Sequence, residues 1–159
     1  MMYQVGDKIV HPLHGAGSIC EIVKKRVEGQ EKPYYVMLTP RGDMRILIPV
    51  DRSEQIGIRP IIEREEARSL LDAIPELPLC EEGNWNKRYR ENMVHIRSGD
   101  LLKVAAVIKA LVQKDNTSGL SNGERKMLHS AKQILLSELM LSQDCTYDEV
   151  EERLYAALR

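Results

Sequence analysis

Two histidines near the N-terminus, His11 and His14 in the segment HPLHG, come nearest in spacing to a pair of metal ligands. The segment is typical of a turn after a strand, and no cysteine or carboxylate cluster lies near it. A zinc site needs three or four protein ligands, so we expect no metal here. Both histidines are interpreted as turn residues near a strand end.

Signatures of catalysis and of nucleotide binding are missing as well. The GAG segment at residues 15–17 lacks the later glycine and lysine of a phosphate-binding loop. No serine or cysteine lies in a nucleophile motif, and the carboxylates concentrate in segments with helical spacing. RGD at residues 41–43 is interpreted as a hairpin turn. We therefore predict a protein that is not an enzyme and uses no cofactor.

The stretch EEGNWNKRYREN, residues 81–92, combines the one tryptophan of the chain with a run of cations. Trp85 is flanked by asparagines, and Lys87, Arg88 and Arg90 follow it within two helical turns. A helix that begins just before the tryptophan would offer free amide groups to a phosphate. An exposed ring beside cations can wedge or stack at an unpaired or distorted base step. This pattern favours a junction in DNA over the reading of a long sequence.

The same tryptophan has a second interpretation. On a helix, Trp85 shares a stripe with Tyr89, Met93 and Ile96, so its ring could instead close the end of a buried helix face. The protein would then be an adaptor that binds a partner by strand addition, with no direct role on DNA. A blue-shifted tryptophan emission insensitive to DNA would support this alternative.

Charge is segregated along a chain whose net charge is only -1. Acidic residues dominate residues 61–82 and 144–152, whereas residues 83–98 are mainly basic. A local basic patch on a near-neutral chain fits one defined anionic contact. The chain has no apolar stretch long enough for a bilayer, no signal-peptide core and three widely spaced cysteines. These features predict a cytoplasmic protein with no membrane contact.

The first 60 residues are typical of short strands joined by turns. Expected strands are residues 8–10, 18–27, 33–39 and 44–50. Several short strands with hairpin turns predict a small five-stranded barrel. Pro49 indicates an edge or a strand end, and an exposed edge can accept a partner strand.

From residue 61 onward the apolar residues follow helical spacing, which predicts a compact bundle of about five helices. The segments SNGE and TYDE are capping boxes that begin the last two. The expected helices are residues 63–74, residues 84 to about 97, and three that start near Leu101, after Ser121 and after Thr146. The fold class is thus α+β, with domains at residues 1–60 and 61–159.

Four segments in register resemble the CarD/CdnL family of bacterial transcription regulators, over nearly the whole chain. They are VGDKIVHPLHGAG, RGDMRILIPV, NWNKRYREN and LSNGERKMLHSAKQILLSEL. The resemblance implies a Tudor-like N-terminal domain, similar to the polymerase-binding module of the transcription-repair coupling factor, that docks on the RNA polymerase β subunit. It also implies a helical domain that contacts promoter DNA near the upstream edge of the transcription bubble.

The resemblance further implies which residues make these contacts. An exposed strand at residues 44–49 would pair edge-on with polymerase, and Lys25 lies where the family has a basic residue facing acidic groups. Leu47 stands where some relatives carry a second basic residue. Backbone pairing and Arg45 are therefore the expected contacts with polymerase. Trp85 would wedge into the minor groove. The residues implied for polymerase are Lys25, Met44, Arg45, Ile46, Leu47, Ile48 and Pro49, and those for DNA are Trp85, Lys87, Arg88, Arg90, Arg125 and Lys126.

The implied function is to stabilise promoter open complexes with little dependence on the DNA sequence. We expect a monomer, and self-association through the exposed strand stays open as an alternative. A further alternative is an architectural partner in a larger regulator complex. Such relatives usually carry an added basic DNA-binding tail, and the sequence up to Arg159 contains none.

Overall fold

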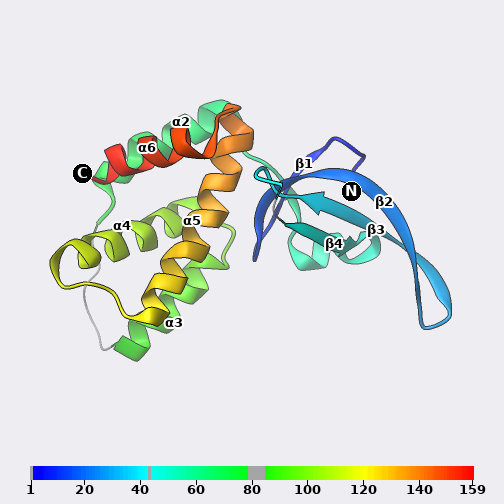
Figure 1. The fold of residues 1–159 in the computed structure, drawn as a ribbon, viewed down its shortest axis with the longest axis horizontal. Helices are drawn as coiled ribbons and strands as arrows, with labels where there is room; N and C mark the ends of the chain where they lie inside the picture. The colour runs from blue at the N-terminus through cyan, green and yellow to red at the C-terminus, as the bar shows by residue number, and fades with distance from the viewer. Residues whose placement is uncertain (1, 43, 79–84) are drawn as a thin grey trace.

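The structure, a computed structural model, describes residues 2–42, 44–78 and 85–159, with Trp85 and Asn86 described by their backbone alone (Figure 1). The protein is α+β: a five-stranded antiparallel sheet is followed by a bundle of helices, as the sequence predicted. The sheet order is β4-β3-β2-β1-β5. The strands are β1 (Lys8–His11), β2 (Gly15–Val27), β3 (Gln30–Leu38), β4 (Arg45–Pro49) and β5 (Arg59–Pro60).

The predicted barrel is wrong, because the sheet is open. β4 and β5 are its two edges and do not pair with each other. The fifth strand, β5, was not among the four strands located in the sequence. It pairs with β1 through two residues, Pro60 opposite Ile9 and Arg59 opposite Val10. A strand this short and ending in proline cannot continue the ladder to close a barrel.

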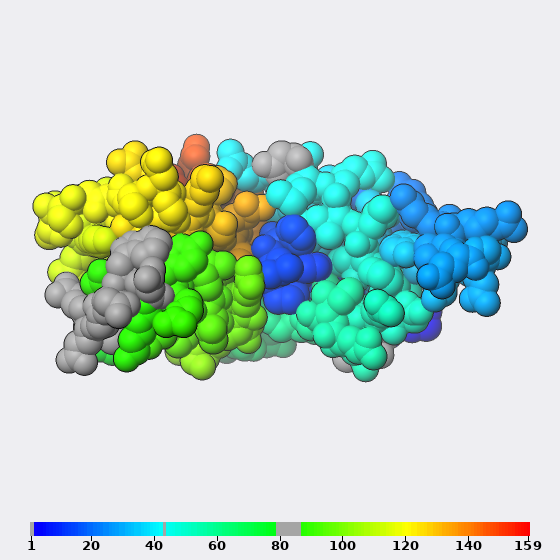
Figure 2. Space-filling model, turned by 90° about the horizontal axis from the view of Figure 1, so that it is seen from below, coloured from blue at the N-terminus to red at the C-terminus, as the bar shows by residue number. Residues whose placement is uncertain are grey.

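Alternation along the strands builds the core of the sheet. Ile9, Ile19, Met37 and Ile48 project to one face and are almost completely buried. Tyr35 joins them, and its hydroxyl accepts a hydrogen bond from the amide of Tyr3 at 2.9 Å. β2 and β3 continue beyond this core as a long hairpin whose tip forms one end of the molecule (Figures 1 and 2).

Six α-helices are found in the described residues, one more than predicted. The additional helix, α1, is a single turn in the N-terminal part, whereas the other five form the expected bundle. The helices are α1 (Ser53–Ile56), α2 (Arg64–Ala73), α3 (Trp85–Ile96), α4 (Leu101–Thr117), α5 (Asn122–Gln143) and α6 (Tyr147–Leu158). Short 3-10 helices cover Val50–Arg52 and Ile74–Glu76. None of the helices in the described ranges is long and apolar enough to cross a membrane.

Both predicted capping boxes are confirmed. The hydroxyls of Ser121 and Thr146 accept hydrogen bonds from the amides of Glu124 and Glu149, and each glutamate bonds back to the cap amide. Residue 84, where the second expected helix begins, lies outside the described residues.

Helix α5 connects the bundle to the sheet (Figure 1). The amide of Ala16 at the start of β2 donates to the hydroxyl of Ser137 at 2.8 Å. Gly15 has φ +87°, and a Cβ atom there would lie 2.5 Å from that hydroxyl. A side chain at Gly15 would therefore be both strained and in collision with the helix, so only glycine fits this approach.

Two further contacts cross the same boundary. The carboxylate of Glu138 on α5 is fully buried and accepts hydrogen bonds from Arg59 Nη1 and Nη2 and from the Ile62 amide, each at 2.8 Å. The guanidinium of Arg41 lies 4.3 Å from the ring centroid of Tyr147 on α6. Arg41, predicted only as part of a turn, thus also contacts the helical bundle.

Candidate functional site

Strand β4 is an open edge of the sheet, and its backbone groups point outward in a fixed pattern. The register with β3 places Val36 opposite Leu47 and Tyr34 opposite Pro49. Proline has no amide hydrogen, so the Tyr34–Pro49 pair cannot exchange hydrogen bonds. Because antiparallel pairs alternate, the Val36–Leu47 pair does not exchange them either. The amide and carbonyl of Leu47 therefore point away from β3.

The residues predicted to dock fall into two groups on this strand. Arg45, like Leu47, directs its backbone outward, since it lies two positions before Leu47 in the strand. Ile46 and Ile48 bond to β3, and their side chains contact the core of the sheet. Met44, predicted inside the strand, precedes it instead, and its carbonyl accepts the Thr39 amide at 3.1 Å.

The outer face of the sheet beside β4 carries the exposed side chain of Leu47 and several charged residues. Leu47 is 43% exposed. Arg45 Nη2 lies 3.0 Å from Glu21 Oε2, so this arginine is partly neutralised. Lys25 is exposed on the same face of β2 as Glu21, four residues along the strand, and pairs with Lys32 of β3. The face therefore remains positive toward the hairpin.

Helix α3 presents two exposed cations, Lys87 and Arg90, on one face. Glu91 and Val94 are exposed on the same face, whereas Arg88 on the flank is half-buried. The side chain of Trp85 lies outside the described residues, so the structure gives only its place, the first residue of the helix. In Figure 2, α3 (green) lies in the half of the molecule away from the hairpin.

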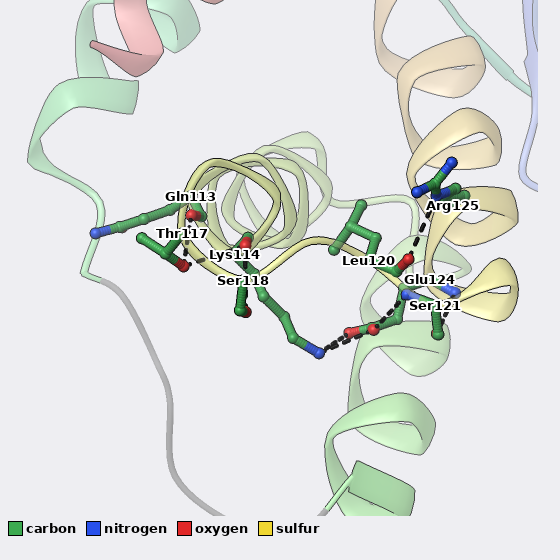
Figure 3. A network of polar contacts seen from close by, with 8 residues as sticks. All are labelled: Gln113, Lys114, Thr117, Ser118, Leu120, Ser121, Glu124 and Arg125. Carbon is green, nitrogen blue, oxygen red and sulfur yellow. Dashed lines mark hydrogen bonds and ion pairs between the residues drawn. The ribbon is translucent and has the colours of Figure 1, made fainter.

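The N-terminus of α5 adjoins α3. A Cβ atom on Gly123 would lie 3.9 Å from the ring of Tyr89, so this ring packs beside the first turn of α5. The two predicted cations there, Arg125 and Lys126, are exposed. Arg125 Nε donates to the Leu120 carbonyl at 3.3 Å, which holds the side chain near the cap (Figure 3). Predicted DNA-binding residues from both helices thus lie at one end of the bundle.

An ion pair fixes the loop that leads into α5. Lys114 Nζ lies 2.8 and 2.7 Å from the two carboxylate oxygens of Glu124 (Figure 3). Burial pushes the pKa of Glu124 upward, but the hydrogen bonds from Lys114 and Ser121 outweigh it and lower the pKa below its ordinary value of 4.5. Glu124 therefore stays ionised near neutral pH, and its charge is balanced by Lys114 at the helix end where a phosphate would approach.

Of the two histidines considered as metal ligands, His11 is the last residue of β1 and not a turn residue as predicted, whereas His14 lies in the turn that follows. Their ring centroids lie 4.7 Å apart, and the ring planes are tilted by 54°. Nδ1 of His11 accepts the amide of Leu13 at 3.0 Å, so this nitrogen is occupied. Within the described residues no group of three or more metal-binding side chains occurs. Burial, and then the neighbouring His14, lower the pKa of His11 to about 4.

This shift predicts a loss of stability in mild acid. The unfolded chain takes up a proton at His11 near pH 6.5, whereas the folded chain resists it until about pH 4. We expect the free energy of unfolding to fall by about 2 kcal/mol between pH 7 and pH 5. Urea unfolding at the two pH values measures the loss, and His11→Gln should remove most of it. An equal pH dependence in His11→Gln would contradict the assignment.

Several residues that shape these surfaces were missed by the sequence reasoning. Lys109 Nζ donates to the carbonyls of Ile74, Pro75 and Leu77 at 2.8 to 3.0 Å, which secures the end of the 3-10 turn after α2. Glu138 was treated only as one of the carboxylates in segments with helical spacing. No local pattern distinguishes such residues, because their partners lie 32 to 79 positions away in the sequence.

The two-part fold agrees with the comparisons of this chain with known families. Residues 3–62 match the CarD-like/TRCF RID domain, and residues 69–155 match the CarD C-terminal domain. The chain therefore belongs to the CarD family of transcription regulators, which confirms the resemblance found in the sequence.

A curated relative supports this membership. The chain is 29% identical, over 150 residues, to "Putative transcription factor YdeB" of Bacillus subtilis (strain 168), covering 94% of this chain and 98% of that protein. The names of the family and of the relative point to a transcription factor and not to an enzyme.

Proposed function

We propose that this protein regulates transcription initiation: residues 1–60 bind the RNA polymerase β subunit, and residues 61–159 stabilise the promoter open complex. The match of residues 3–62 to a domain shared with the coupling factor carries the first half of the proposal. The open edge of β4 supports it, because outward amide and carbonyl groups can add a strand from a partner. This role would place the protein in the bacterial cytoplasm, on the nucleoid through polymerase.

The basic end of the bundle supports the second half. Exposed Lys87 and Arg90 on α3, with Arg125 and Lys126 on α5, suit contacts to phosphates at the upstream edge of the bubble. These four side chains are long cations, which suits contacts to the DNA backbone more than the reading of bases. We assign Trp85, the first residue of α3, as the minor-groove wedge.

The proposed mechanism couples three equilibria: binding to polymerase, binding to DNA and melting of the promoter. Binding to polymerase raises the local concentration of a weak DNA binder, so modest separate affinities suffice. A wedge that favours unstacked DNA binds the open complex better than the closed one, and only this difference shifts melting. A tenfold shift needs about 1.4 kcal/mol, within the range of one aromatic stacking contact. Promoters limited by melting would be activated, and promoters limited by escape would be repressed.

The lifetime of open complexes on a slowly melting promoter tests this proposal. With the matching polymerase and a heparin challenge, we expect the protein to prolong the lifetime roughly tenfold. On a template with a mismatched, already open bubble the gain should be much smaller, because melting no longer opposes the complex. A protein that binds polymerase but leaves both lifetimes unchanged would instead be an adaptor without a role on DNA.

A further inference from the structure

We propose that Glu138 is a positioning residue that holds the DNA-facing end of the bundle at a fixed place relative to strand β4. The inference rests on the proposed function, because it concerns how two binding surfaces act together. It starts from the contacts across the boundary between sheet and bundle, which converge on the C-terminal half of α5.

Helix α5 extends from the boundary with the sheet to the end of the bundle that carries Arg125 and Lys126. Its cap, Ser121, lies at the basic end of the bundle, and Glu138 lies 17 residues further along, at the sheet. At about 1.5 Å per residue, the helix separates the two by roughly 25 Å. A tilt of α5 by about 10° at the sheet would displace its far end by roughly 4 Å. The contacts at Glu138 therefore help to decide where that end lies.

The contacts at Glu138 resist such a tilt. Its carboxylate receives three hydrogen bonds at 2.8 Å, two from Arg59 on β5 and one from the amide of Ile62 in the connection to α2. Apolar surfaces can slide past each other, whereas a bidentate guanidinium–carboxylate pair has one favoured geometry. The side chain is 0% exposed, so a tilt would leave a buried charge without its donors.

A rigid connection matters for a protein that holds two partners at once. The effective concentration of the second binding event depends on how well the linkage matches the span between the sites. If the bundle swung freely, polymerase would still be bound, but the basic end would meet the DNA less often. Loss of Glu138 should therefore separate the two activities.

The experiment uses the full chain with Glu138→Gln. The amide keeps the shape of the carboxylate but turns a donor toward Arg59. Dyes on Gln30→Cys and Glu152→Cys, both exposed positions, with the native cysteines replaced by serine, report the distance between sheet and bundle by single-molecule FRET. We expect one narrow distribution for the parent protein and a broadened one for the variant. Polymerase affinity should stay within twofold, while the gain in open-complex lifetime falls at least threefold.

Glu151→Gln is the matched control, because Glu151 pairs with Lys132 of α5 at 2.8 Å inside the bundle. It should keep the narrow distribution and the full lifetime. A narrow distribution in Glu138→Gln would overturn the inference. If that variant does not fold, Arg59→Lys replaces it, because lysine keeps a positive charge opposite Glu138 but cannot form the bidentate pair. An unchanged distribution in Arg59→Lys would again overturn the inference. A parent protein without effect on lifetime counts against the proposed function, while FRET still decides the role of Glu138.

Discussion

Leu47→Pro is expected to weaken binding to the polymerase β subunit at least tenfold without unfolding the sheet. The Leu47 amide points away from β3, so proline removes a hydrogen-bond donor from the open edge and none from the ladder. A partner carbonyl left without its donor costs about 1–3 kcal/mol, and 1.4 kcal/mol corresponds to tenfold in affinity. Edge strands tolerate proline, as Pro49 already illustrates.

Two controls separate the backbone from the side chain. Leu47→Ala keeps the amide and removes the 43% exposed side chain, so it should retain most of the affinity. Ile46→Pro removes an amide that bonds to β3, so it should lower the melting temperature clearly. Calorimetric titration with the β lobe measures affinity, and circular dichroism measures folding. Weak binding by Leu47→Ala with normal binding by Leu47→Pro would replace strand addition with side-chain docking.

Trp85→Ala is expected to remove most of the gain in open-complex lifetime and to leave polymerase binding unchanged. Removal of one stacking contact of about 1–3 kcal/mol reduces the gain by roughly tenfold. Trp85→Phe should keep part of it, because a smaller ring still fills the wedge. Lifetimes under heparin challenge and affinity for polymerase are measured on the same preparations.

The alternative for Trp85 makes the opposite prediction. If the ring closes the apolar stripe of α3 that includes Tyr89, Met93 and Ile96, its removal creates a cavity and lowers the melting temperature. A variant that unfolds, or that is as active as the parent, places Trp85 in the core. The contact with DNA would then depend on the cations of α3 and α5.

The helices were predictable from sequence because their signals are local. Ser121 and Thr146 each begin a helix with a partner three residues away, and the apolar spacing of α4 and α5 extends over several turns. The strands up to β4 were found for a similar reason, since alternation and turn residues mark them. Such signals act within one element and do not depend on how elements are arranged.

The open sheet and the boundary with the bundle could not be predicted in this way. β5 is two residues long, so no alternation marks it, and its pairing with β1 joins residues about 50 positions apart. In the sequence, Glu138 cannot be distinguished from other glutamates on helices, because its partner Arg59 is 79 positions away. The position of Gly15 against Ser137 likewise exists only after the two modules have packed.

The open edge of β4 also has a consequence for how much free protein a cell can carry. A strand with unpaired backbone groups can template the assembly of identical chains, and a short edge bearing charge limits this hazard. Here the edge is five residues long, ends at Pro49 and carries the Arg45–Glu21 pair on its outer face. When the protein is produced in excess over its partner, we expect free copies to pair through β4 and, at higher concentration, to precipitate. This self-association would set an upper limit on the concentration of free protein in the cell.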